Sequence, residues 1–107
     1  MTFGLSENII SEILNVFLQF SEIEEAILYG SRAKGNFKTG SDIDISLRGD
    51  RLSVELLAKV SSQLDDLPIP HTIDLSILDH IKNTDLLDHI HQVGKVIFSK
   101  SGGALMR

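Results

Sequence analysis

The chain has 107 residues, which is enough for one domain with a hydrophobic core and too few for a second, substrate-binding domain. Its 42% hydrophobic and 23% charged residues are typical of a soluble globular protein and exclude a disordered or membrane-spanning chain. The formal net charge of −5 argues against strong polynucleotide binding, and the absence of cysteine excludes disulfides and thiolate metal sites. The start of the sequence lacks a secretory signal pattern, so we expect a cytoplasmic protein.

The first half of the sequence predicts one helix and two strands. Ser6 can cap a helix whose apolar residues recur at three- and four-residue steps. After a polar break, the apolar run 26–29 predicts a short buried strand that ends at Gly30. A loop up to Ser41 then leads into the alternating run 42–47, which predicts a strand with one wet face. We expect these two strands to pair antiparallel.

The second half predicts two helices and two strands. An amphipathic helix runs from Asp50 and ends near Pro68, which cannot continue it. The alternating run 72–77 predicts another strand with one wet face. A helix over 84–93 stops at a glycine, and the run 95–99 predicts a final strand.

This order of elements predicts an α/β (α+β) fold built on a small mixed sheet. We expect one domain over residues 1–107, in which residues 100–107 form a loose tail. The helices should pack on one face of the sheet and leave the other face for an active site.

Three aspartates interrupt the two alternating runs. Asp42 and Asp44 are two residues apart on one predicted strand and therefore share its wet face, and Asp74 takes the same position on the other. If the strands are neighbours, the three carboxylates converge into a negative field that a divalent cation would relieve. The alternative is that these charges only keep an edge strand soluble. We favour a metal-dependent phosphate chemistry.

The loop before the first of these strands carries the chain's one compact basic cluster. Gly30 allows a phosphate close to the backbone, and Ser31 can donate hydrogen bonds to it. Arg32 and Lys34 can neutralise phosphate oxygens, although Arg32 can equally form a structural ion pair. Ser41 is a further candidate for nucleotide contact, with a turn residue as the alternative.

These two features together resemble the signature of the nucleotidyltransferase superfamily related to DNA polymerase beta. Residues 30–35 read Gly-Ser-Arg-Ala-Lys-Gly, and after five further residues 41–45 read Ser-Asp-Ile-Asp-Ile. The combination is similar, more narrowly, to the minimal nucleotidyltransferase (MNT) domains, whose motif runs G-S-R-A-x-G, a short spacer and S-D-I-D-L. Asp74 lies where that family keeps its third carboxylate. The resemblance covers nearly the whole chain and implies a nucleotidyltransferase fold.

The resemblance also implies an activity. Asp42 and Asp44 would bind one or two Mg²⁺ ions, and Asp74 would bind the ion nearest the attacking hydroxyl or accept its proton. The reaction would be attack of an acceptor hydroxyl on the alpha phosphorus of a nucleoside triphosphate, with ATP as the donor that the family favours.

MNT domains commonly act with a small helical HEPN-domain protein, frequently a toxin, and some silence it by attaching adenylate. The resemblance therefore implies an antitoxin of a HEPN/MNT pair, whose acceptor is the partner protein. Two alternatives remain open. The chain could neutralise its HEPN partner by contact without catalysis, or it could modify a small molecule as aminoglycoside nucleotidyltransferases do, with a pocket completed by a second copy of the chain.

Two other groups of residues lie near the predicted site or carry side chains that can bind ligands. Phe37 can stack on a base or cover a hydrophobic edge, and the sequence does not separate these possibilities. His89 and His91 are two residues apart on a predicted helix, which places them on different faces, so we expect no zinc site there.

Overall fold

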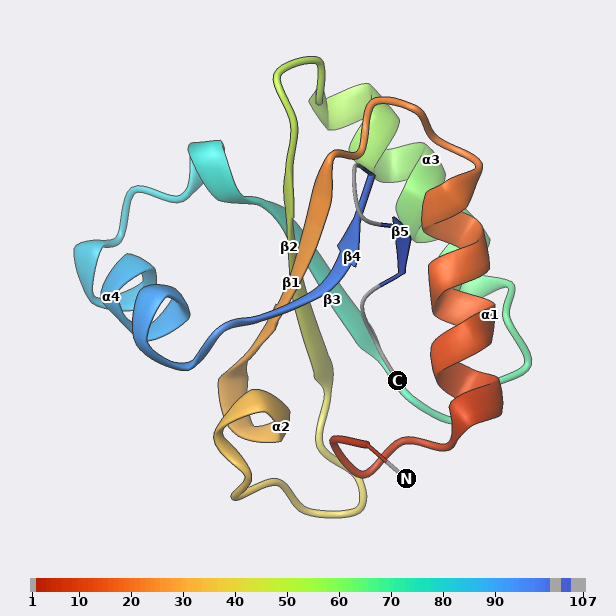
Figure 1. Cartoon of the computed structure of the whole chain (residues 1–107), viewed down its shortest axis with the longest axis vertical. Coiled ribbons are helices and arrows are strands. Elements are labelled where there is room, and N and C mark those ends of the chain that lie inside the picture. The colour runs from red at the N-terminus through yellow and green to blue at the C-terminus, as the bar shows by residue number, and fades with distance from the viewer. Residues whose placement is uncertain (1, 101–102, 105–107) are drawn as a thin grey trace.

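The computed structural model of the chain describes residues 2–100 and 103–104. Its centre is a five-stranded mixed sheet with the strand order β3-β2-β1-β4-β5 (Figure 1). The elements in chain order are α1 (Glu7–Leu18), β1 (Glu25–Tyr29), α2 (Gly30–Lys34), β2 (Ile43–Arg48), α3 (Val54–Asp65), β3 (Ile73–Ile77), the 3₁₀ turn η1 (Leu78–His80), α4 (Thr84–Val93), β4 (Lys95–Ser99) and β5 (Gly103–Ala104).

Side-chain caps fix where the three longer helices begin. Ser6, Ser53 and Asn83 each precede a helix and accept a hydrogen bond from a backbone amide in its first turn. The cap at Ser6 confirms the predicted start of α1. The cap at Ser53 explains why α3 begins at Val54, later than the predicted start at Asp50.

The pairing of the strands agrees with the sequence pattern. β1 and β2 are antiparallel, as predicted. β2 and β3 are parallel neighbours, and α3 makes the crossover between them. β1 also pairs antiparallel with β4, with an irregularity between Ala26 and Ile27. The predicted mixed α/β sheet is therefore confirmed.

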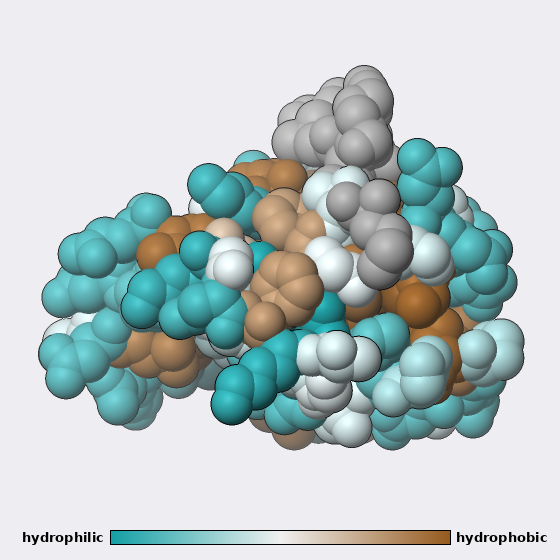
Figure 2. Space-filling model, turned by 90° about the horizontal axis from the view of Figure 1, so that it is seen from below, coloured by the Kyte–Doolittle hydropathy of each residue, from teal (hydrophilic) through white to brown (hydrophobic). Residues whose placement is uncertain are grey.

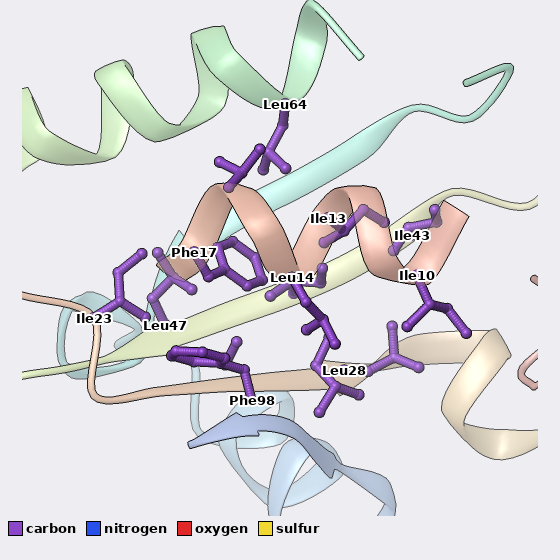
Figure 3. Packing of buried hydrophobic residues seen from close by; sticks show 14 of the residues in the cluster. Ile10, Ile13, Leu14, Phe17, Ile23, Leu28, Ile43, Leu47, Leu64 and Phe98 are labelled. Atoms are coloured by element: carbon purple, nitrogen blue, oxygen red, sulfur yellow. The ribbon is translucent and has the colours of Figure 1, made fainter. Parts of the chain in front are cut away.

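The hydrophobic core lies between one face of the sheet and the helices α1 and α3. Figure 3 shows side chains from α1, β1, β2 and α3 interleaved in this layer. The apolar members of the alternating run in β2 are fully buried there, which confirms the face assigned to them. They are Ile43, Ile45 and Leu47.

Helix α4 lies on the opposite side of the sheet from α1 and α3 (Figure 1). A Cβ atom placed on Gly94, at the end of α4, would lie 2.9 Å from the Ile27 side chain of β1. The expectation that the helices share one face therefore holds for α1 and α3 and fails for α4. This helix partly covers the face that carries the aspartates.

The C-terminal segment differs from the expected loose tail. Gly103 and Ala104 form β5, which pairs with Phe98 and Ser99 of β4, and the Lys100 amide donates to the Glu24 carbonyl. Residues 101–102 and 105–107 lie outside the described residues. Within the described part of the chain, no helix is long and apolar enough to cross a membrane.

Phe17 provides a test of the core. It is fully buried in α1, with its ring centroid 6.1 Å from that of Phe98. We expect Phe17→Ala to lower the free energy of unfolding by about 3–5 kcal/mol, because it leaves a cavity beneath the sheet. Leu18→Ala, at a neighbouring side chain that is 61% exposed, should change it by less than about 0.5 kcal/mol. Urea unfolding measures both, and equal effects would contradict this packing.

Candidate active site

The parallel register of β2 and β3 brings the three aspartates together. Asp44 is the direct neighbour of Asp74 across the two strands, and Asp42 immediately precedes β2, two residues before Asp44. Neighbouring strands lie about 4.8 Å apart, so paired side chains on one face are close. Tyr29 of β1 pairs with Asp44 from the other direction. The structure therefore places Asp74 beside Asp44 and brings the charge of Asp42 close enough to act on Asp44.

Electrostatic repulsion among these groups acts on Asp44. Partial burial raises the pKa of Asp44 above its ordinary value, and the negative charges of Asp74 and Asp42 raise it further. His89 acts in the opposite direction. The face therefore holds an uncompensated negative charge, which is the condition that favours cation binding.

A chain of hydroxyl groups lies beside the carboxylates. The Ser76 hydroxyl donates to the Ser46 hydroxyl at 3.0 Å, and these two residues are direct neighbours in β3 and β2. Burial raises the pKa of the Tyr29 phenol, although a hydrogen bond with Ser76 opposes that change. The polar atoms of this half-buried strip are therefore bonded to one another, which limits the cost of placing them in the sheet.

Gly30 is required at the end of β1 because the Asp44 carboxylate lies against it. Its φ is +74°, and a Cβ atom at this position would lie 2.2 Å from Oδ2 of Asp44. The sequence suggested that Gly30 makes room for a phosphate. The structure adds that it makes room for Asp44.

Arg32 does not face the open surface as a phosphate clamp would. It is only 2% exposed, and its guanidinium donates hydrogen bonds to the carbonyls of Phe3, Thr39 and Ser41. The expectation that Arg32 binds nucleotide is therefore wrong. The alternative, a structural ion pair, is replaced by hydrogen bonds to backbone carbonyls. A buried cation bonded to carbonyls from two segments fixes the loop that precedes Asp42.

The Phe37 ring lies against Arg32, with the guanidinium carbon 5.1 Å from the ring centroid. A Cβ atom on Gly4 would also lie 2.2 Å from this ring. Of the two roles left open for Phe37, covering the protein surface matches these contacts.

The other loop residues fall into two groups. The Ser41 hydroxyl accepts a hydrogen bond from the Lys38 amide at 2.8 Å, which corresponds to the turn role that was its alternative. Ser31 is half-buried in the first turn of α2, and Lys34 is exposed at the end of that helix. Figure 2 shows this end of the molecule, where hydrophilic residues cover much of the surface.

His89 is a site residue that the sequence analysis missed. The Gly30 amide donates to Nε2 of His89 at 3.0 Å, and the His89 ring meets the Tyr29 ring edge-on at 6.2 Å. The two partners are 59 residues apart, and nothing in the local pattern of α4 links them. That His89 and His91 form no zinc site stays a prediction.

The donor set fits a hard divalent cation. Among the described residues, no group of three His, Cys, Asp or Glu side chains stands ready to enclose an ion. Mg²⁺ is usually held by one or two carboxylates together with substrate phosphates and water, so a pair such as Asp42 and Asp44 is sufficient. A bound cation would favour the charged form of Asp44, whose pKa is raised first by burial and then by the charges of Asp74 and Asp42.

The sheet and its carboxylate face define a class of nucleotide-transferring domains. Residues 11–102 match the family model described as "Polymerase beta, Nucleotidyltransferase". The chain therefore belongs to this nucleotidyltransferase family. No curated protein sequence matches it significantly.

Solved structures share the fold. A Sulfolobus solfataricus protein assigned to the nucleotidyltransferases is 18% identical with a TM-score of 0.62, covering 94% of this chain and 86% of that one. A chain of a toxin-antitoxin complex with AMP-PNP is 27% identical with a TM-score of 0.61, covering 92% and 77%. A complex of tri-AMPylated Shewanella oneidensis HEPN toxin with MNT antitoxin matches at 21% identity and a TM-score of 0.59, covering 92% and 76%. The chain thus resembles MNT antitoxins found with HEPN toxins.

The contact between Gly30 and Asp44 predicts a difference between two glycine substitutions. Gly30→Ala and Gly35→Ala both place a side chain at positive φ, at +74° and +93°, but only the Gly30 position meets another residue within 4 Å. Both should lower the free energy of unfolding by about 1–2 kcal/mol through backbone strain. Gly30→Ala should also move Asp44, which is measured by the pKa of its carboxyl group in NMR titration. An unchanged Asp44 pKa in Gly30→Ala would contradict the contact.

The raised pKa of Asp44 predicts how stability depends on pH. A carboxyl group whose pKa is raised by folding stabilises the folded state below its unfolded pKa and loses that contribution as the pH rises through its folded pKa. The free energy of unfolding of Asp44→Asn, relative to that of the wild type, should therefore increase as the pH rises above 3.8, the ordinary pKa of an aspartate. Thermal unfolding across this range measures the difference. Asp65→Asn, an exposed residue in α3, should show no such rise, and a parallel response of both variants would refute the assignment.

Proposed function

We propose that this chain is a metal-dependent nucleotidyltransferase that transfers AMP from ATP to a hydroxyl group of a HEPN-type toxin partner and thereby acts as its antitoxin. The observation that carries the proposal is the in-register pairing of Asp44 with Asp74 on the face shared with Asp42, beside the Gly30 turn. Membership of the nucleotidyltransferase family supports the class of reaction.

Asp42 and Asp44 would hold Mg²⁺, which when bound neutralises phosphate charge and stabilises the entering and leaving oxygens. Asp74, in the edge strand β3, would orient the acceptor hydroxyl and take its proton. The acceptor oxygen forms a bond to the alpha phosphorus as the bond to the beta-phosphate oxygen breaks. Pyrophosphate leaves, and the acceptor keeps the nucleotide as a phosphoester.

Ser31 and Lys34 are the proposed contacts for the triphosphate. Ser31 offers a hydroxyl next to the Gly30 turn, and Lys34 offers an exposed cation one helical turn further on. Arg32 takes part indirectly, because it holds the Ser41 carbonyl just before Asp42.

The choice of acceptor rests on the structural neighbours. One neighbour is a toxin-antitoxin complex with AMP-PNP, and another contains a tri-AMPylated HEPN toxin. A further complex carries a double variant in which two aspartates two residues apart in the sequence are replaced by glutamate. This spacing is that of Asp42 and Asp44. A reaction that consumes ATP requires a compartment that contains ATP, so the proposed function would take place in the cytoplasm.

Radiolabel transfer tests the proposal. The chain is incubated with Mg²⁺, ATP labelled at the alpha phosphate and a HEPN-domain protein from the same organism, and protein-bound label is followed over time. We expect label on the partner, and we expect the double variant Asp42→Asn with Asp44→Asn to reduce its rate by about a hundredfold or more. Loss of an outer-shell partner alone costs about 10–100-fold, and the loss of ligands should exceed it.

Two controls make the result specific. Asp65→Asn removes an exposed carboxylate on α3, behind the sheet, and should label at the wild-type rate. Addition of EDTA should stop labelling by both proteins. Neutralisation of the partner without label, or full labelling by the double variant, would refute the catalytic proposal, and the former would favour inhibition by contact.

A further inference from the structure

His89 contacts the site through the main chain of Gly30. Nε2 of His89 accepts the Gly30 amide hydrogen at 3.0 Å, so this nitrogen is unprotonated and Nδ1 carries the ring hydrogen. Gly30 is the first residue of α2, and within the described chain Tyr29 gives that helix no side-chain cap. His89 therefore satisfies, from α4, one of the backbone amides that the first turn of a helix leaves without an intrahelical partner.

The other side of Gly30 is in contact with Asp44. A Cβ atom on Gly30 would lie 2.2 Å from Oδ2 of Asp44 and 3.2 Å from its carboxyl carbon. The Asp44 carboxylate thus rests on the Gly30 main chain, while His89 holds the amide of the same residue. A displacement of Gly30 would move the carboxylate with it, because Asp44 also lies in a strand paired to β1 at Tyr29.

We propose that His89 is a positioning residue for the transfer site: its bond to the Gly30 amide fixes the turn against which the Asp44 carboxylate is held. The inference rests on the proposed function, because it assigns His89 to the site formed by Asp42, Asp44 and Asp74. It gives α4, which lies on the carboxylate side of the sheet, a part in the site beyond packing.

The ring of His89 also packs on Tyr29, so a purely structural role must be separated from the role of its acceptor nitrogen. His89→Phe keeps an aromatic ring beside Tyr29 and removes the acceptor. His89→Gln removes the ring and places an amide oxygen at about the reach of Nε2. If His89 acts through its acceptor nitrogen, the glutamine variant should keep more transfer activity than the phenylalanine variant. If His89 acts only by packing on Tyr29, the order should be reversed.

The hydrogen bond itself is tested first, on the unmodified chain without nucleotide or partner. In ¹⁵N-labelled protein, an N–H···N hydrogen bond transmits a scalar coupling between its two nitrogens. We expect this coupling between the Gly30 amide nitrogen and Nε2 of His89, and we expect His89 to be the tautomer protonated on Nδ1. A His89 protonated on Nε2, or a Gly30 amide without this coupling, overturns the proposal whatever the activity of the chain.

The kinetic test compares the variants with a matched control, His91→Phe, which alters an exposed histidine on the same helix. His89→Phe should lower kcat for AMP transfer by about 10–100-fold and leave KM for ATP nearly unchanged, because a misplaced Asp44 acts mainly in the transition state. His89→Gln should restore most of kcat, and His91→Phe should resemble the wild type. Equal loss in both His89 variants, or an unaltered His89→Phe, overturns the positioning role.

Mn²⁺ binding separates this inference from the proposed function. If the wild type transfers no AMP to any HEPN protein, the proposed function fails. The role of His89 can still be tested, because Mn²⁺ binding is measured from the paramagnetic relaxation of the Asp44 NMR signals. We then expect weaker Mn²⁺ binding by His89→Phe than by His89→Gln. The reverse order overturns the positioning role.

Discussion

The parallel, in-register pairing of β2 with β3 is the constraint on which the rest of the molecule depends. It sets Ile43 beside Ile73 and Asp44 beside Asp74, so the two strands present one apolar and one acidic face. A slip by a single residue would send Asp74 into the core and an isoleucine or leucine into the site. Burial of the apolar face under α1 and α3 therefore also selects the position of the carboxylates.

The acidic face is a place where function and stability oppose each other. Burial raises the pKa of Asp44, and repulsion from the neighbouring carboxylates of Asp74 and Asp42 raises it further. The neighbouring residues that hold the carboxylates in place carry no negative charge. Gly30 leaves room for Asp44, His89 binds Gly30, and Arg32 fixes the loop that delivers Asp42. The site is thus supported by residues of two helices, α2 and α4, which lie outside the strands that carry Asp44 and Asp74.

Much of this could be predicted from local sequence patterns. The alternation in 42–47 and 72–77 was sufficient for two half-buried strands, and because side chains alternate along a strand, it also assigned each residue to a face. The polar cap at Ser6 predicted the start of α1 for an equally local reason. The grouping of Asp42, Asp44 and Asp74 followed as soon as the strands were neighbours.

The sequence did not reveal two kinds of feature: elements too short to show a period, and contacts between separate segments. The helix α2 has only five residues and the strand β5 only two, so neither shows a periodic pattern. The burial of Arg32 depends on carbonyls from residues 3, 39 and 41, and the role of His89 depends on α4 lying on the carboxylate side. The same charge that predicts phosphate binding in a loop can be used to hold that loop together.

The position of a bound cation is the most direct test of this account. A second group of carboxylates lies at the opposite end of the sheet, where it is mixed with basic side chains, so the protein contains its own comparison site. It includes Glu22, Glu24 and Asp50 together with Arg48, Arg51 and Lys100. In ¹⁵N-labelled protein with Mn²⁺ and a nonhydrolysable ATP analogue, paramagnetic broadening reports which region holds the ion. The account predicts that the signals of Gly30, Asp42, Asp44 and Asp74 broaden first. Broadening that begins at the opposite end of the sheet, or is equal at both ends, would contradict it.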